Sequence, residues 1–291
     1  MSERDTSRRA AGAAALSVGA AGALTTVKVV LGVLTGSVAV ISEAVHSASD
    51  LVAALVAFWA IRAASKPPDR DHPYGHDRAE NLASLLQGAL VVAAGTFVAV
   101  EAIRRLFGSP EPVRRVDLAL VVIGVSAIVA LVVSLRLRRV AQVTGSSALA
   151  ADAIHLATDV WTTAAVGVGL LAVRATGSRW IDAAVALLVS MFVVGVGARL
   201  CWASANVLAD SNLPDDEISR VEAVLAELSV DGLSFHKLRG RQAGRKRHID
   251  LHMVVPPETT VRAGHQLSGR VKQAVASAVP NAEVLIHLED H

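Results

Sequence analysis

Runs of Ala, Val, Leu and Gly about twenty residues long recur through the first two thirds of this chain, and they constrain its fold more than any other feature. A helix of that length spans the hydrocarbon core of a bilayer, which is about 30 Å thick. The sequence is 53% hydrophobic over 291 residues, whereas a soluble domain of this size carries more charge and shorter apolar runs. The chain is therefore predicted to be an α-helical polytopic membrane protein.

The apolar stretches and the charges that flank them predict six transmembrane helices. These are expected at residues 11–35, 38–62, 80–106, 116–135, 148–173 and 181–204. An even number of spans places both termini on one side of the membrane. Lys and Arg are more frequent in the segments on that side than in those on the other, which predicts cytoplasmic termini.

The last third of the chain has the composition of a soluble domain. Pro214 and two acids open a helical pattern, and two strands follow around the turn RGRQAG. A helix near residues 260–278 and the strand AEVLIHLE end the chain. The order αββαβ predicts a small α+β, ferredoxin-like domain. We therefore expect a six-helix membrane domain at residues 1–207 and a cytoplasmic domain at 208–291.

Two pairs of polar residues interrupt the apolar spans. His46 and Asp50 lie four residues apart in the second span, and His155 and Asp159 repeat this spacing in the fifth. Residues at i and i+4 share one face of a helix, and an ionisable group at the centre of a span costs on the order of 2.5–3.5 kcal/mol. If the two faces meet, two imidazole nitrogens and two carboxylates surround one point. Such a ligand set suits tetrahedral Zn²⁺ better than Mg²⁺ or Ca²⁺.

The charges of these four residues suggest an exchange of ions. Two carboxylates and one divalent cation sum to zero, so the loaded site is tolerable inside the bilayer. Without metal, protonation of the same side chains would relieve the two bare charges, so metal ions and protons compete. A site of this kind can exchange Zn²⁺ for H⁺ across the membrane.

Two other interpretations of the buried polar residues remain open. A single intramembrane His or Asp can simply anchor a hydrogen bond between helices. Glu43 and Asp152, each three residues before a histidine, resemble the ligand spacing of di-iron carboxylate enzymes. That site also needs acids from the middle of two further helices, whereas Glu80, Glu101 and Asp182 lie near span ends. Glu43 and Asp152 are better explained as residues that support the metal ligands or contact other helices.

With these pairs, the chain resembles the cation diffusion facilitator family of metal/proton antiporters over nearly its whole length. The segments that carry the resemblance are EAVHSASD, PDRDHPYGHDRAE and SSALAADAIHLATDV. The resemblance implies a homodimeric transporter whose transport site is His46, Asp50, His155 and Asp159. Family members with His at the first of these positions resemble zinc-selective transporters, whereas those with Asp accept a wider range of metals, including cadmium.

The same resemblance implies two features around the second and third spans. Asp69, His72 and His76 match a second family metal site, in the loop between those spans. A solvated turn before a helix would explain the same segment without a metal. Arg78 and Asp210 match a pair of charges that links the third span to the C-terminal domain. The implied role of that pair is a charge interlock.

In the C-terminal domain, the resemblance implies metal binding at the dimer interface. The ligands carried over are His236, His252, His265, His287 and Glu289. Glu289 stands where the family often has Asp, which puts the second metal ion of this site in doubt. Surface histidines without a metal are the alternative.

Several function classes are excluded or disfavoured. A single cysteine excludes an internal disulfide and a Cys-rich metal cluster, and scattered basic residues make no nucleic-acid footprint. The loop RLRRVAQVTGSS lacks the histidines common in vesicular family members, which favours a bacterial inner (plasma) membrane.

We therefore expect a transporter and not an enzyme, with Zn²⁺ and protons as its ions. Transport of Fe²⁺, Co²⁺, Ni²⁺, Mn²⁺ or Cd²⁺, or a metal-sensing or structural role in the membrane, remains open. His248 and Lys28 have no assigned role; the lysine is expected to snorkel or to pair with an acid.

Overall fold

A computed structural model describes residues 3–35, 38–107, 116–176, 180–229 and 233–290. The chain divides into two compact units, residues 1–204 and 205–291. The predicted boundary between residues 207 and 208 lies close to this division. Each unit is described separately below.

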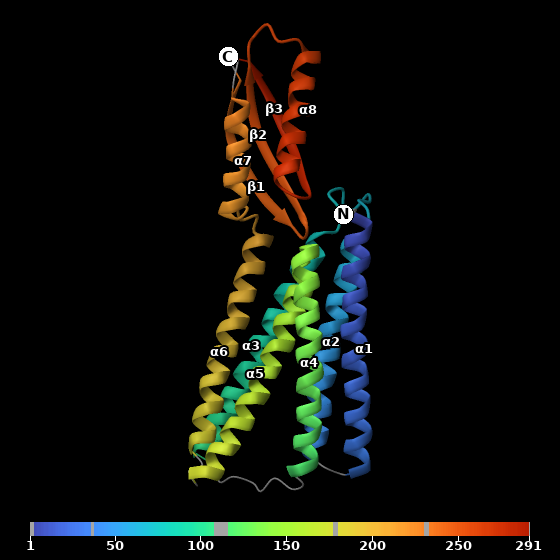
Figure 1. The fold of residues 1–291 in the computed structure, drawn as a ribbon, viewed down its shortest axis with the longest axis vertical. Coiled ribbons are helices and arrows are strands. Elements are labelled where there is room, and N and C mark those ends of the chain that lie inside the picture. The colour runs from blue at the N-terminus through green and yellow to red at the C-terminus, as the bar shows by residue number, and fades with distance from the viewer. Residues whose placement is uncertain (1–2, 36–37, 108–115, 177–179, 230–232, 291) are drawn as a thin grey trace. The chain divides into compact units, whose positions relative to one another are not determined.

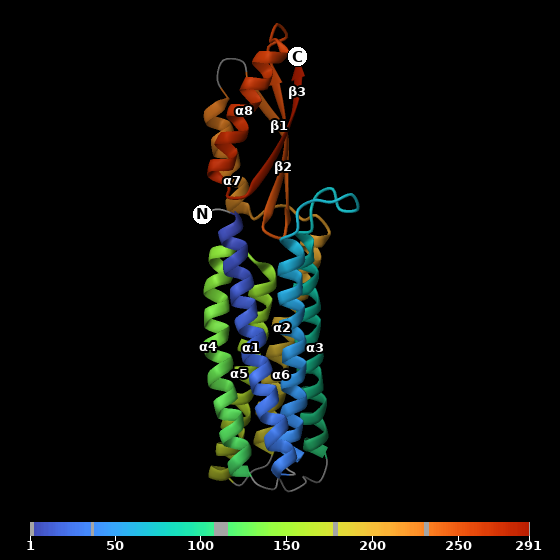
Figure 2. The same cartoon turned by 90° about the vertical axis from the view of Figure 1, so that its right-hand side faces the viewer.

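The first unit consists of six long helices that run side by side (Figures 1 and 2). They are α1 (Glu3–Thr35), α2 (Val38–Ala64), α3 (Arg78–Phe107), α4 (Val116–Thr144), α5 (Ser147–Thr176) and α6 (Trp180–Leu208). The predicted membrane architecture is therefore confirmed. Each helix extends beyond its predicted apolar span, and the longest extensions, at the start of α1 and the end of α4, contain charged residues such as Arg8, Arg9, Arg138 and Arg139.

Four of these helices contain, within their described residues, a segment long and apolar enough to cross a membrane. The segments are Asp5–Leu31, His46–Ala64, Arg78–Arg104 and Ala184–Leu208. Many of their large apolar side chains, such as Phe97 and Trp202, are exposed on the outside of the bundle. An apolar exterior is expected where lipid is the solvent.

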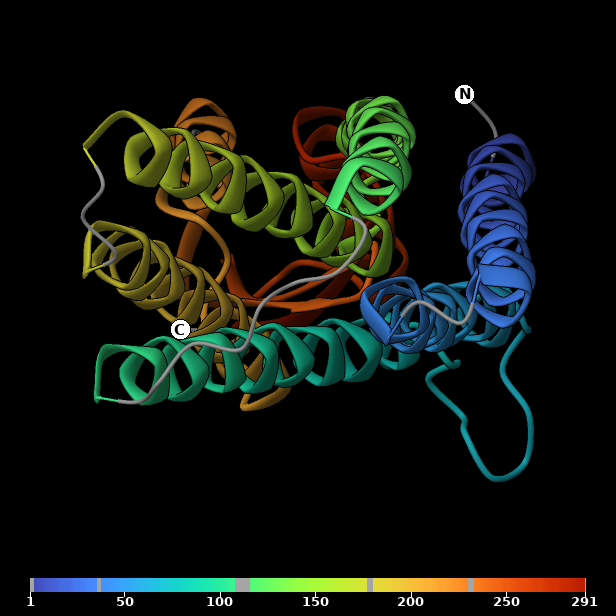
Figure 3. The same cartoon turned by 90° about the horizontal axis from the view of Figure 1, so that it is seen from below.

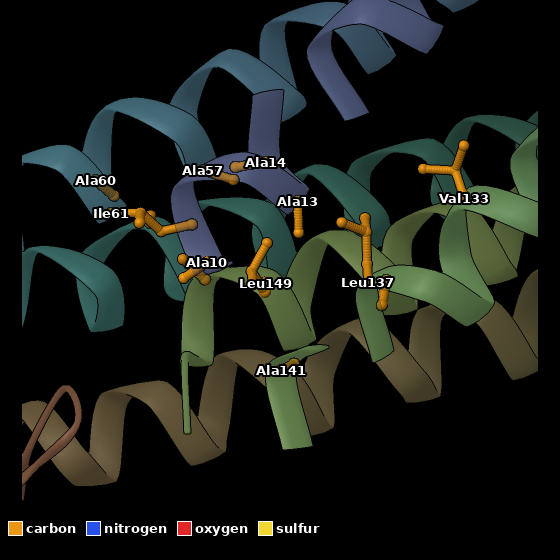
Figure 4. Close-up of a cluster of buried hydrophobic side chains, with 13 residues drawn as sticks. Ala10, Ala13, Ala14, Ala57, Ala60, Ile61, Val133, Leu137, Ala141 and Leu149 are labelled. Atoms are coloured by element: carbon orange, nitrogen blue, oxygen red, sulfur yellow. The ribbon is translucent and has the colours of Figure 1, made fainter. Parts of the chain in front are cut away.

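Small residues dominate the interior of this unit. One buried cluster joins alanines of α1 and α2 to larger side chains of α2, α4 and α5, including Ile61, Leu137 and Leu149 (Figure 4). Lipid-facing apolar groups gain nothing from leaving lipid, so membrane helices associate through close packing, which small residues permit. The same cluster holds α1 against α2 and α4, and α4 against α5.

Glycines bring α3 and α6 into close contact, and the two helices lie side by side when the bundle is seen end-on (Figure 3). A Cβ atom built on Gly197 would lie 2.9 Å from the backbone N of Val92 and 3.0 Å from the backbone O of Gly88. A Cβ on Gly88 would lie 2.8 Å from the Sγ of Cys201. Only glycine therefore fits at these two positions without displacing a helix.

The second unit has the predicted order αββαβ. Its elements are α7 (Asp215–Leu228), β1 (Ser234–Ala243), β2 (Lys246–Val255), α8 (Val261–Ala278) and β3 (Ala282–Asp290). The sheet order is β1-β2-β3, with β1 antiparallel and β3 parallel to β2. The predicted turn RGRQAG is wrong in extent, because most of that segment belongs to β1. The chain reverses instead at Gly244 and Arg245, where Gly244 has φ 55°, a conformation that glycine adopts readily.

The alternation expected for β2 is present. Ile249, Leu251 and Met253 are buried and pack with α7 and α8 residues such as Val221 and Val275. Successive side chains of a strand point to opposite faces, so the histidines and the acid of β2 lie on the face away from this core.

Candidate metal centres

The two intramembrane His–Asp pairs come together between α2 and α5. The Nε2 atom of His155 lies 3.5 Å from the Oδ1 atom of Asp50 and 3.9 Å from the Oδ2 atom of Asp159. The Nε2 atom of His46 lies 3.7 Å from the Oδ1 atom of Asp159 and 3.9 Å from that of Asp50. Donor atoms of a tetrahedral Zn²⁺ site with bonds of about 2.0–2.2 Å lie about 3.3–3.6 Å apart. The ligand atoms of His46, Asp50 and Asp159 already lie within 4.8 Å of one another, whereas His155 lies outside this group and would have to move inward for all four residues to bind one ion.

Several buried atoms of this cluster have no hydrogen-bond partner, as expected of atoms that bind a cation. The Oδ1 atom of Asp50, the Nε2 atom of His155 and the Oδ2 atom of Asp159 are buried and have no hydrogen-bond partner. Buried polar atoms normally have one, because an unsatisfied group costs about 1–3 kcal/mol. These three atoms belong to the predicted ligand set, and a divalent ion among them would satisfy all three.

Interhelical hydrogen bonds hold the two ligand-bearing helices in place. The Nε2 atom of Gln87 on α3 donates to the carbonyl of Ala53 on α2, at 3.1 Å. The hydroxyl of Ser134 on α4 donates to the carbonyl of Ala153 on α5, at 2.8 Å. Each bond anchors its helix within one turn of a predicted ligand, so the ligands project from fixed backbones.

The di-metal carboxylate alternative gains no support. Glu80 lies in the first turn of α3 and accepts a 2.6 Å hydrogen bond from the hydroxyl of Ser146. Among the described side chains, the metal-competent group around His46 contains only Asp50 and Asp159 as acids. Asp152 is buried near these acids, and the side chain of Glu43 lies outside the described residues.

Of the two placements expected for Lys28, snorkelling or pairing with an acid, snorkelling is not what the structure shows. Its side chain is 3% exposed, and its Nζ atom donates a 2.7 Å hydrogen bond to the hydroxyl of Ser47 on α2. Ser47 follows His46 directly in the sequence. The sequence shows that Ser47 is next to the predicted ligand His46. It does not show that Lys28 of α1 faces this part of α2.

The predicted loop ligands also lie together, in the segment between α2 and α3. The Nδ1 atom of His72 is 3.3 Å from the Oδ1 atom of Asp69, and the Nε2 atom of His76 is 3.2 Å from the Oδ2 atom. The pKa of Asp69 lies below its usual value, chiefly because the backbone N–H of His72 donates to its carboxylate. An ionised carboxylate beside two imidazoles can hold a metal ion, and it also forms the turn that brings the imidazoles together.

We expect Asp69→Ala to lower the metal content of the purified full-length protein by one ion per chain. The change removes the carboxylate that contacts both imidazoles. Asp71→Ala is the matched control, because Asp71 is an exposed acid of the same loop. Elemental analysis after equilibration with Zn²⁺ measures the ratio. An equal zinc content in both variants would contradict a metal site in the loop.

In the C-terminal domain, the register of the sheet places three histidines in one row. His236 on β1 and His287 on β3 both pair with His252 on the central strand. The carboxylate of Glu289 lies 2.6 Å from the Nδ1 atom of His252 and 3.0 Å from the Nε2 atom of His236. The side-chain hydrogen bond with His252 is the main reason that the pKa of Glu289 lies below its usual value.

The other C-terminal prediction, His265, lies apart from this row. His265 is exposed on α8, and the group of His236, His252 and Glu289 that could hold a metal ion includes neither His265 nor His287. His248, which had no assigned role, lies 3.3 Å from the carboxylate of Glu283 on the neighbouring strand.

The charge interlock of Arg78 and Asp210 stays a prediction. The two residues belong to different units. Within the second unit, Asp210 forms a 3.1 Å ion pair with Arg241.

Comparison with known proteins gives matches over nearly the whole chain. A family profile described as the cation efflux transmembrane domain matches residues 14–209, and one described as the cytoplasmic domain of cation efflux proteins matches residues 213–291. The uncharacterised transporter sll1263 of Synechocystis sp. is 35% identical over 288 residues, which cover 98% of this chain and 91% of that protein. The cation-efflux pump FieF of Shewanella oneidensis is 31% identical over 271 residues, which cover 93% and 90% respectively.

A solved structure of CzrB in its Zn form is 34% identical and covers 28% of this chain and 93% of that one, with a TM-score of 0.27.

Proposed function

The chain belongs to the cation efflux family, the cation diffusion facilitators, and from this premise we propose that it is a Zn²⁺/H⁺ antiporter of the bacterial inner membrane. The observation that carries the proposal is the convergence of two imidazoles and two carboxylates from α2 and α5. Four ligands without a thiol favour Zn²⁺ among the common divalent ions.

Proton coupling follows from the chemistry of the ligands. Carboxylates and imidazoles bind metal only when deprotonated, so metal binding displaces protons and protonation releases metal. The two aspartates match the charge of one divalent ion. We propose that the site takes metal from the cytoplasm and that protons displace it on the other side.

The soluble domain has a proposed place in the same scheme. Its histidine row and Glu289 form a second candidate metal centre, at which two copies of the chain would associate as a homodimer. His265 would then act only if the partner copy brings it to the row, since it lies apart within one chain. Both termini are proposed to be cytoplasmic.

The proposal is tested by Zn²⁺ uptake into proteoliposomes under a pH gradient. We expect uptake that depends on the gradient and collapses with a protonophore. Zn²⁺ uptake that does not depend on the pH gradient would refute proton coupling. If Fe²⁺, Co²⁺, Ni²⁺, Mn²⁺ or Cd²⁺ is taken up in preference to Zn²⁺, that metal and not zinc is the substrate. Tight Zn²⁺ binding without any flux would indicate a sensor.

We expect His46→Asp to admit Cd²⁺ while Zn²⁺ transport continues. The change replaces an imidazole nitrogen with carboxylate oxygens, which discriminate less in favour of Zn²⁺. Uptake of both metals in competition measures the change in selectivity. His46→Ala is the control: it removes the ligand without a replacement and should weaken Zn²⁺ uptake without admitting Cd²⁺. If His46→Asp leaves the selectivity between Zn²⁺ and Cd²⁺ unchanged, His46 does not determine metal selectivity.

A further inference from the structure

The lysine of the first membrane helix is held inside the bundle next to the transport site. An unpaired ammonium at this depth would be costly, and Lys28 lowers that cost by donating to Ser47. Thr25, one turn earlier on α1, donates to the backbone carbonyl of the same Ser47, at 2.8 Å. The end of the Lys28 side chain is therefore fixed against α2 at the residue that follows His46.

A second ionisable residue outside the ligand set is buried near the same cluster. Asp152 is 1% exposed and lies on α5, one helical turn before His155. Its Oδ2 atom has no hydrogen-bond partner. Asp152 is close enough to Asp50 and Asp159 for their charges to interact, and Lys28 interacts in the same way with Asp159.

These residues form one electrostatic group. Among the described side chains, with neutral histidines, the carboxylates of Asp50, Asp152 and Asp159 and the ammonium of Lys28 sum to a net charge of −2. One divalent cation neutralises that charge. The two ligand aspartates alone would give the same sum, so Lys28 and Asp152 cancel each other.

We propose that Lys28 and Asp152 are a compensating pair that holds the net charge of the transport site at −2, the value that one divalent cation neutralises. Neither residue binds the metal; each acts on it through the field at the site. The inference rests on the proposed transport function and assigns roles to two residues outside the four ligands.

The two single substitutions should have opposite effects. Lys28→Gln removes a positive charge, so the KM for Zn²⁺ should fall about tenfold, and kcat should fall as well because the ion leaves more slowly. Asp152→Asn removes a negative charge, so the KM should rise about tenfold. The double variant restores the net charge of −2, and its KM should return to within about threefold of wild type.

The experiment measures KM and kcat for Zn²⁺ uptake by full-length protein in proteoliposomes. The pH gradient is fixed, and the outside solution, from which Zn²⁺ is taken up, is more alkaline than the lumen. KM reports on the transported ion and not on the loop or C-terminal sites. Lys28→Arg, which keeps the charge, should retain a KM near wild type. Ser47→Ala, which removes the hydrogen-bond acceptor and keeps the charge, should not lower KM.

If Lys28 only holds α1 against α2 and has no electrostatic role, the reverse pattern is expected. Lys28→Gln would then raise KM, as Ser47→Ala would, and the double variant would be worse than either single variant; this pattern would overturn the proposal. If Lys28→Gln does not fold, the proposal is decided by Asp152→Asn, since an unchanged KM there refutes it. Wild-type protein without Zn²⁺ uptake would instead overturn the proposed function.

Discussion

Asp50→Ala is expected to lower Zn²⁺ uptake at least a hundredfold. The variant removes one of two carboxylates, so a bound divalent ion would leave one uncompensated positive charge inside the bilayer. Removing one partner of a buried charge pair costs about 3–5 kcal/mol, which corresponds to roughly a hundredfold or more in affinity. The Oδ1 atom of Asp50, 3.5 Å from the Nε2 atom of His155, is central to the cluster.

The measurement is the initial rate of Zn²⁺ uptake under a fixed pH gradient, with equal amounts of reconstituted protein. Ser49→Ala is the matched control, because Ser49 precedes Asp50 on the same helix and is exposed. We expect the control to transport at close to the wild-type rate. Uptake by Asp50→Ala within a few fold of the control would refute the cluster as the transport site.

Gly197→Ala is expected to destabilise the membrane domain by about 1–3 kcal/mol, the usual cost of overpacking. The added Cβ would lie 2.9 Å from the backbone N of Val92 and 3.0 Å from the backbone O of Gly88. Backbone atoms cannot turn aside as a side chain can, so α3 and α6 must separate. Since α3 also supports α2 through Gln87, transport should decline together with stability.

Cys201, the single cysteine, provides the measurement. Its Sγ atom packs against Gly88 at the α3–α6 contact, so a thiol-reactive fluorogenic dye reports when that contact opens on heating. Gly195→Ala is the matched control on the same helix, because its Cβ would meet nothing within 4 Å. Alanine favours helix by up to about 1 kcal/mol over glycine, so Gly195→Ala should melt at or above the wild-type temperature. Equal melting of the two variants would contradict the tight contact.

Much of the candidate site could be predicted because its signals are local. The spacing of His46 and Asp50, and that of His155 and Asp159, places each pair on one helix face by the period of the α-helix. The alternation in β2 likewise separates the core-facing Ile249 from the polar face. The turn RGRQAG was misplaced because the strand continues through Gly240, where packing against Leu213 is not visible in the local sequence.

The residues that the sequence did not explain depend on contacts between distant segments. Lys28 has the same local sequence whether it snorkels to the surface or is buried, and only Ser47, nineteen residues away, decides between the two. His248 finds Glu283 because β3 pairs in parallel with β2. His265 is a histidine like the three in the row on the sheet, but it lies on α8, apart from that row.

A membrane domain of six helices, a small α+β domain and two intramembrane polar pairs could all be predicted from the amino-acid sequence. Apolar length and helical period follow from the energy of transfer into lipid and from backbone geometry, and both are properties of short segments. That α2 and α5 turn these pairs toward each other, and that Lys28 and Asp152 lie beside them, became visible only when the helices were packed together. The field at a buried site depends on every charge around it, and those charges come from helices whose packing no single segment specifies.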